Sequence, residues 1–161
     1  GLSTSALQLA RAYTALADNG VLHSVSLLKR DEDNEMLRVF SAKTAKRVRA
    51  MLETVIMKDG TAYEARVDGY SVAGKTGTVK KAGAGGYTEK SYFSVFAGMA
   101  PANNPRLIIV VMIDEPSAGQ YYGGLVSAPV FSKVMAGALR VLEVAPDKEG
   151  SMPVLLTRPA L

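Results

Sequence analysis

Apolar residues recur at helical spacing near the start of the chain. Ser5 can cap a helix there, and Gln8, three residues on, can complete a capping box with it. The apolar side chains that follow lie on one helical face: Leu7, Ala10, Tyr13, Leu16 and Ala17. Asn19-Gly20 then favours a left-handed stop. The pattern predicts a helix between Ser5 and Asn19.

The next forty residues predict a short β-hairpin and a second helix. Residues 21–30 have the pattern of a strand, 31–35 form a polar turn, and 36–40 return as a second short strand. Ser41 then caps a helix that we expect to end at Gly60. The predicted buried face of this helix consists of Val48, Met51, Leu52, Val55 and Ile56.

Three further strands are predicted in the second half of the chain. Residues 70–79 (YSVAGKTGTV) form a strand with unusual glycine content, which often marks the close approach of a ligand or another backbone. Residues 80–90 are rich in Lys and Gly and are expected to form a loop. Two strong strands follow at 91–100 and 106–114, and the proline-rich turn 101–105 makes them antiparallel.

A last helix is predicted from Ala128 to Val144, with Pro129 near its first turn. Beyond Pro146 the apolar periodicity ends. We therefore expect one domain over residues 1–145 and a C-terminal tail over 146–161. The order of elements predicts an α+β fold in which helices pack on an antiparallel sheet.

Composition narrows the functional classes. The chain has no cysteine and one histidine, which excludes disulfides, thiolate metal sites and multi-histidine metal centres, so no metal and no cofactor are expected. The net charge is +4, but aromatic residues are not interleaved with the basic ones, which favours a solvated basic face over a nucleic-acid site. No stretch reaches the ~18 apolar residues of a membrane span. The sequence opens directly on a helix signal, so we expect it to begin inside a longer protein.

The strongest candidate for chemistry is the run from Lys75 to Thr78, which reads Lys-Thr-Gly-Thr. An ammonium and a hydroxyl close together can hold a substrate carboxylate. Gly77 has no side chain, so a substrate can lie against the strand, and nearby backbone N–H groups can stabilise an oxyanion. The alternative is a glycine-containing edge strand with a solvated lysine, and the tripeptide alone leaves both readings open.

Four stretches in order decide between these readings. They are GLSTSALQLARAY at 1–13, GTAYEARVDGYSVAGKTGT at 60–78, FAGMAPANNPRLIIVVMIDEP at 96–116 and YYGGLVSAPVF at 121–131. Together they resemble the C-terminal part of the transpeptidase domain of class B penicillin-binding proteins, most of all the division-specific group of Gram-negative bacteria. The resemblance implies a penicillin-binding protein/serine β-lactamase-like fold. It also implies a peptidoglycan D,D-transpeptidase that cross-links the wall at the septum and is a target of β-lactams.

The resemblance also implies a role for each site residue. Lys75 would set a positive potential and help proton transfer, and Thr76 and Thr78 would bind the substrate carboxylate. The Thr78 N–H would form half of an oxyanion hole beside Gly77. Tyr121 and Tyr122 match an aromatic pair that lines the substrate cleft, the alternative being two half-exposed tyrosines of a turn.

The chain departs from the family pattern at the nucleophile. Ser-x-Asn is absent, and the one Ser-x-x-Lys, at Ser26–Lys29, falls in a strand-like run rather than at a helix N-terminus. We therefore expect the catalytic serine upstream of Gly1. The alternative is a non-catalytic module of the same fold that binds cell-wall peptide or a division partner. A D,D-carboxypeptidase or a β-lactamase is a closer variant, in which water is the acceptor.

Partners and location follow from the resemblance alone. Peptidoglycan stem peptides, β-lactam antibiotics and other cell-division proteins are the expected partners, without nucleic acid. The expected location is the periplasmic face of the bacterial inner membrane, with the membrane anchor outside this chain.

Overall fold

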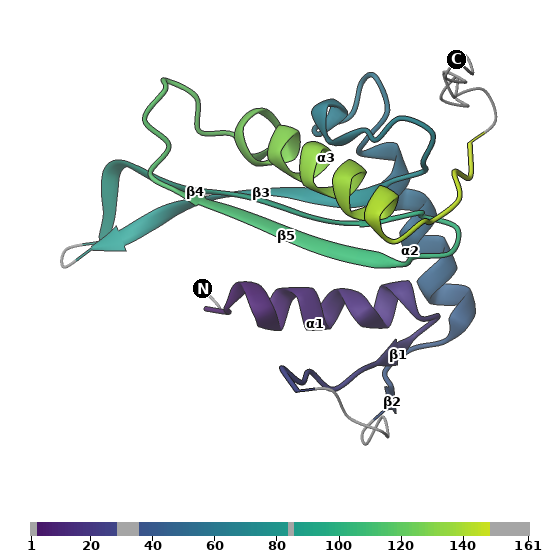
Figure 1. Cartoon of the computed structure of the whole chain (residues 1–161). Helices are drawn as coiled ribbons and strands as arrows, with labels where there is room; N and C mark the ends of the chain where they lie inside the picture. Colours follow the sequence, from purple (N-terminus) through teal and green to yellow (C-terminus); the bar gives the residue numbers. More distant parts are fainter. Residues whose placement is uncertain (1–2, 29–35, 84–85, 149–161) are drawn as a thin grey trace, which may run out of the picture.

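The computed structural model describes residues 3–28, 36–83 and 86–148. The elements follow in the order α1 (Ala6–Ala17), β1 (Val21–Leu22), β2 (Leu37–Arg38), α2 (Ala42–Thr54), the 3₁₀ helix η1 (Tyr63–Ala65), β3 (Ala73–Gly83), β4 (Gly86–Ala100), β5 (Leu107–Asp114) and α3 (Gly123–Val141). Figure 1 shows α1 and α3 on opposite sides of the sheet formed by β3, β4 and β5. The predicted α+β architecture is confirmed.

The sheet is antiparallel, in the order β3-β4-β5. Phe96 of β4 lies opposite Thr76 of β3 and Val111 of β5. Because side chains alternate between the faces of a sheet, these three share one face and their neighbours share the other. Within the described residues β3 is an edge strand, so one side of its backbone faces away from the sheet.

Each face of the sheet has its own hydrophobic core. Toward α3, the fully buried rings of Phe96 and Phe131 pack edge to face with centroids 4.7 Å apart. Toward α1, the buried core consists of Ala73, Met99 and Ala102, with Tyr13 and Leu16 of α1 packed against it. The strand that carries Lys75 is thus fixed between two packed layers.

Length and apolar composition would allow α3 to cross a membrane, which the sequence pattern did not predict. Its buried residues include Phe131, Met135 and Leu139, which lie in the core over the sheet. A core helix passes the same length and composition test. We therefore describe α3 as the helix that covers one face of the sheet.

Both predicted N-caps are confirmed. The Gln8 N–H donates to Ser5 Oγ at 3.1 Å, and Gln8 Oε1 accepts from the Ser5 N–H at 2.9 Å, which completes the capping box. At the second helix, the Thr44 N–H donates to Ser41 Oγ at 3.1 Å. These caps are local, so the sequence was sufficient to predict them.

Two residues predicted to be buried are exposed. Leu7 lies in the first turn of α1, away from the contacts of Tyr13 and Leu16, and is 55% exposed. Met51 is 65% exposed because α2 turns Arg49 inward instead, and these residues lie about 200° apart around the helix. The Arg49 guanidinium donates to the carbonyl oxygens of Leu16 and Ala17, so it satisfies acceptors at the end of α1.

The predicted hairpin and the predicted end of the second helix need correction. Residues 23–28 are not strand, β1 and β2 have two residues each, and 29–35 lie outside the described residues. The second helix ends at Thr54 rather than at Gly60. The chain turns back there, and the Ala62 N–H bonds to the Val55 carbonyl at 2.9 Å.

The predicted loop over residues 80–90 is wrong for the part that the structure describes. The strand begins at Ala73 rather than at residue 70 and continues to Gly83, while β4 already begins at Gly86. A register shift between Lys80 and Ala82 accommodates the extension. Lys81 also binds Asp114 at 2.9 Å and Glu115 at 2.8 Å. Tertiary pairing therefore overrides the weak strand propensity of Lys and Gly.

The last helix begins at Gly123 rather than at Ala128 and ends at Val141 rather than at Val144. Pro129 consequently lies in its second turn, not its first. Residues 142–148 then return to Gly69 and Ser71, with which Asp147 forms hydrogen bonds. Residues 149–161 lie outside the described residues. The boundary between a domain at 1–145 and a tail stays a prediction.

Candidate active site

The alternation of β3 divides the residues of the Lys-Thr-Gly-Thr run between two faces. Thr76 and Thr78 pair with Phe96 and Ser94, so their side chains share the face that α3 covers. Lys75 and Gly77 occupy the opposite face. An added Cβ at Gly77 would meet only Val95 Cβ within 4 Å, at 3.5 Å, so this stretch of strand can be approached closely from that side.

The Lys75 ammonium nevertheless reaches Thr76. Its Nζ lies 3.0 Å from Thr76 Oγ1 and 3.1 Å from the Thr76 carbonyl oxygen. The long side chain thus passes around the free edge of β3 and brings a cation to a hydroxyl of the other face. This contact also places the Thr76 carbonyl at the free edge.

Backbone groups of Thr78 should face the same edge. In an antiparallel ladder the N–H and C=O of one residue point the same way, and every second residue repeats that direction. Since the Thr76 carbonyl is at the free edge, the Thr78 N–H is directed there as well. An N–H group in that position can donate a hydrogen bond to the oxyanion that forms on a bound substrate.

Thr61 joins the site and was missed by the sequence analysis. Its Oγ1 lies 3.2 Å from Thr76 Oγ1, although the two residues are 15 positions apart. The only sequence signal was its place within the matching stretch 60–78. An open depression of about 380 Å³ brings together Thr61, Thr76, Thr78, Tyr122, Gly123, Gly124 and Leu125.

Two glycines allow α3 to begin against the strands. A Cβ on Gly123 would lie 2.2 Å from the Val95 carbonyl oxygen, and one on Gly124 would lie 2.0 Å from the Thr61 carbonyl oxygen. The Gly123 N–H donates to Thr78 Oγ1 at 3.2 Å. The predicted helix began only at Ala128, but these glycines already form its first turn, where the contacts leave no room for a side chain.

The two tyrosines contact each other but have different further neighbours in the structure. Tyr122 precedes α3 and lines the depression with Thr76 and Thr78. Tyr121 stacks instead on Tyr92, with ring centroids 4.3 Å apart and planes 11° apart. The hydroxyls of Tyr121 and Tyr122 lie 3.2 Å apart, and this hydrogen bond raises the pKa of Tyr121. Tyr121 therefore contacts Tyr122 and Tyr92 but is not among the residues that line the depression.

Ser26, the serine of the one Ser-x-x-Lys match, is not among the residues that line the depression. Ser26 lies in an irregular segment, where its Oγ donates to the Leu28 carbonyl at 2.7 Å. Its partner Lys29 lies outside the described residues. Among the described residues no group of three or more His, Cys, Asp or Glu side chains could hold a metal ion.

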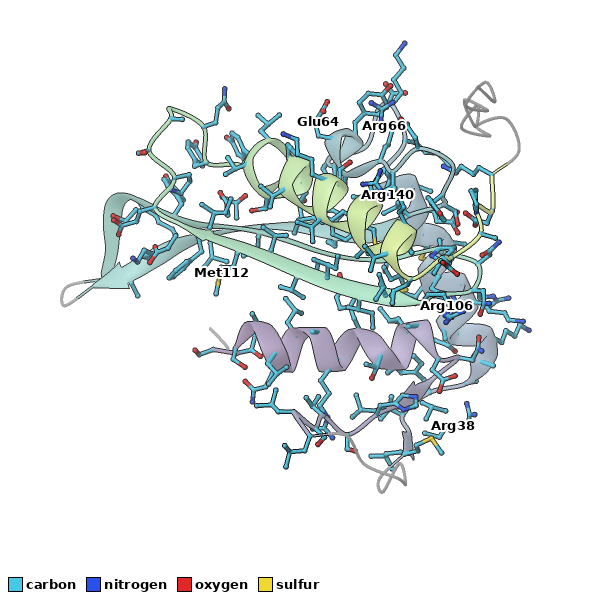
Figure 2. All side chains as sticks on the ribbon, viewed as in Figure 1. Arg38, Glu64, Arg66, Arg106, Met112 and Arg140 are labelled. Atoms are coloured by element: carbon cyan, nitrogen blue, oxygen red, sulfur yellow. The ribbon has the colours of Figure 1, made fainter. Side chains whose placement is uncertain are left out.

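Several side chains project from the molecule away from this depression. Figure 2 shows Met112 projecting from β5 on the side of α1, and Glu64 and Arg66 projecting from the η1 region beside α3. The Arg66 guanidinium lies over the Tyr63 ring, 3.3 Å from its centroid. None of these residues lines the depression.

The structure defines the class of this protein as an α+β domain in which an edge strand with a Lys-Thr-Gly motif lies beside the start of a helix. Residues 1–136 match the family described as "Penicillin binding protein transpeptidase domain". The chain therefore belongs to the penicillin-binding protein transpeptidase family, as the sequence resemblance predicted.

Individual relatives agree with this family. The chain is 46% identical to the "Probable peptidoglycan D,D-transpeptidase PbpC" of Pseudomonas aeruginosa, over 98% of this chain and 28% of that protein. It is 42% identical to the "Peptidoglycan D,D-transpeptidase FtsI" of Escherichia coli K12, over 91% of this chain and 25% of that protein. The apo transpeptidase domain of Burkholderia pseudomallei penicillin-binding protein 3 superposes with a TM-score of 0.84 at 47% identity, over 95% of this chain and 46% of that one. The chain thus spans less than half of each of these relatives.

Proposed function

We propose that this chain provides the Lys-Thr-Gly side of the active site of a peptidoglycan D,D-transpeptidase that cross-links the cell wall at the division septum and is acylated by β-lactams. The observation that carries the proposal is that the Lys75 ammonium contacts the Thr76 hydroxyl, and that Thr76 lines one depression together with Thr78 and Tyr122. Relatives named D,D-transpeptidase support it.

Substrate binding follows from this geometry. The carboxylate of the donor stem peptide, or of a β-lactam, would accept hydrogen bonds from Thr76 and Thr78, with the Lys75 charge close by. The scissile carbonyl would then lie along the free edge of β3, where the Thr78 N–H can stabilise its oxyanion. Tyr122 would cover the apolar part of the bound ligand.

The reaction needs a serine from sequence that precedes Gly1. Its Oγ would attack the penultimate D-Ala carbonyl, and the peptide bond to the terminal D-Ala would break, with the proton passing to the leaving amine. An amine of a neighbouring stem peptide would then attack the acyl-enzyme, forming the cross-link and releasing the serine. A β-lactam would acylate the same serine by ring opening.

The proposed setting is the periplasmic face of the inner membrane, with stem peptides, β-lactams and other division proteins as partners. A second candidate is a module of this fold that binds cell-wall peptide without catalysis, favoured by the absence of a Ser-x-Asn motif from these residues.

Labelling of the intact protein with a fluorescent penicillin tests the proposal. We expect one covalent adduct per molecule, mapped by peptide mass spectrometry to the serine of a Ser-x-x-Lys motif upstream of Gly1. Replacement of that serine by alanine should abolish the adduct. An intact protein that carries the motifs but binds penicillin only reversibly would support the non-catalytic module instead.

A further inference from the structure

The segment that follows α3 is tied back to the residues that lead into β3. The Tyr70 hydroxyl donates to the Val144 carbonyl at 2.5 Å. The backbone N–H groups of Asp147 and Lys148 both donate to the Gly69 carbonyl, at 3.0 and 3.1 Å. The end of the described chain is therefore fixed to residues that precede Lys75 by only a few positions.

The Asp147 carboxylate makes the most specific of these contacts. One of its oxygens accepts from the Ser71 N–H at 2.7 Å, and the other accepts from the Ser71 hydroxyl. Ser71 is only 8% exposed. Its Oγ and its carbonyl in turn accept from the Ala102 N–H at 2.8 and 3.0 Å. Asp147 and the β4–β5 turn thus hold Ser71 from two directions.

The start of α3 contacts β3 beyond Lys75, at Thr78. The N–H of Gly123, at the start of α3, bonds to Thr78 Oγ1. From Ser71, two residues before β3 begins, to Thr78 the extended chain spans ~23 Å at 3.3 Å per residue, and the 19 residues of α3 span ~28 Å. Helix α3 and the segment after it can therefore anchor both ends of the stretch that contains Lys75 and Thr76.

We propose that Asp147 is a positioning residue for the carboxylate-binding hydroxyl of Thr76. The inference rests on the proposed function of this site. β3 pairs with β4 on one side only among the described residues, so a shift at Ser71 would pass along the strand to Thr76. Asp147 opposes that shift because its carboxylate binds both the N–H and the hydroxyl of Ser71, and charged acceptors form the stronger hydrogen bonds.

The first test measures β-lactam acylation of the intact protein, with ground-state binding and the acylation rate constant determined separately. Asp147→Ala should lower the acylation rate constant about ten- to a hundredfold at a temperature well below unfolding, because small misplacements of binding groups are costly. Asp147→Asn should recover part of the rate, since its amide oxygen can still accept from the Ser71 N–H. A rate within twofold of wild type for Asp147→Ala would overturn the proposal.

A double-variant cycle separates positioning from general destabilisation. If Asp147 acts through Thr76, Asp147→Ala combined with Thr76→Val should be no slower than the slower single variant. Losses that multiply would overturn the proposal. Lys148→Ala removes an exposed neighbouring side chain, and Ser5→Ala removes a distant helix cap; both should keep the wild-type rate.

The outcome for wild type keeps the two proposals distinguishable. A wild-type protein that forms no adduct contradicts the proposed function itself. A wild-type protein that is acylated, with an Asp147→Ala variant that is acylated equally fast, contradicts only the positioning role.

Discussion

At the scale of single residues, one long side chain joins the two faces of β3. Strand alternation separates Lys75 from Thr76, yet the ammonium lies 3.0 Å from the Thr76 hydroxyl because β3 is an edge strand of the described sheet. A central strand would have a neighbour in the path of that side chain. The site therefore depends on the position of β3 in the sheet as much as on its residues.

Thr76→Val tests the hydroxyl. Valine keeps the shape of the side chain but can neither donate to a ligand carboxylate nor form hydrogen bonds with Lys75 and Thr61. Loss of one hydrogen bond to a charged group costs about 1.5–3 kcal/mol, so β-lactam acylation of the intact protein should slow roughly ten- to a hundredfold. The same substitution at Thr54, on α2, serves as the control. An unchanged rate for Thr76→Val would show that this threonine does not meet the ligand.

Tyr122→Ala tests the aromatic side of the depression. Tyr122 is 55% exposed and lines the depression with Thr76 and Thr78, so its ring can cover apolar substituents of a ligand. Acylation by a β-lactam with a bulky apolar side chain should lose on the order of 1 kcal/mol in the barrier relative to a small one. Paired rate measurements provide the check. Equal losses for both compounds would indicate a folding defect, and no loss for either would leave Tyr122 as an ordinary turn residue.

At the scale of elements, the two ends of α3 are fixed by different means. Its start is fixed by glycines that fit against Val95 and Thr61, and by the hydrogen bond to Thr78. Its end is a left-handed stop, in which the Val144 N–H donates to the Leu139 carbonyl at 3.0 Å. The residue in the left-handed conformation is Glu143, with a φ of 52°.

Glu143→Gly should stabilise the domain. The left-handed conformation costs a residue with a Cβ about 1–2 kcal/mol, while glycine adds ~0.4–1 kcal/mol of unfolded-state entropy, so a net gain of about 0.5–1 kcal/mol is expected. Urea unfolding of the transpeptidase domain should show a higher midpoint with an unchanged slope. Glu143→Ala keeps the strain and should show no gain. A lower midpoint for the glycine variant would contradict this account.

At the scale of the whole molecule, the 161-residue chain by itself should form no covalent adduct with a fluorescent penicillin. The Ser-x-Asn motif is absent, and the one Ser-x-x-Lys begins at Ser26, whose hydroxyl donates to a nearby backbone carbonyl. Gel fluorescence after denaturation is the measurement, with circular dichroism to verify that the chain is folded. Stoichiometric labelling would contradict the prediction, and labelling at Ser26 would identify that serine as the nucleophile.

The features that the sequence determined alone are those whose partners are close along the chain. The capping box of Ser5 and Gln8 spans three residues, and the predicted strand at 106–114 agrees with β5 within a residue because its apolar run is continuous. The Lys-Thr-Gly-Thr run was also recognisable, since its residues are adjacent. Short-range order of this kind needs no knowledge of the fold.

Tertiary structure alone decided the contacts between distant segments. Thr61 meets Thr76 across 15 positions, Arg49 reaches the end of α1 across 33, and Asp147 holds Ser71 across 76. The same is true of the early start of α3, which depends on what lies against Gly123 and Gly124. Local propensity carries no information about such partners, because packing and hydrogen bonding select them only once the sheet and its two covering helices are in place.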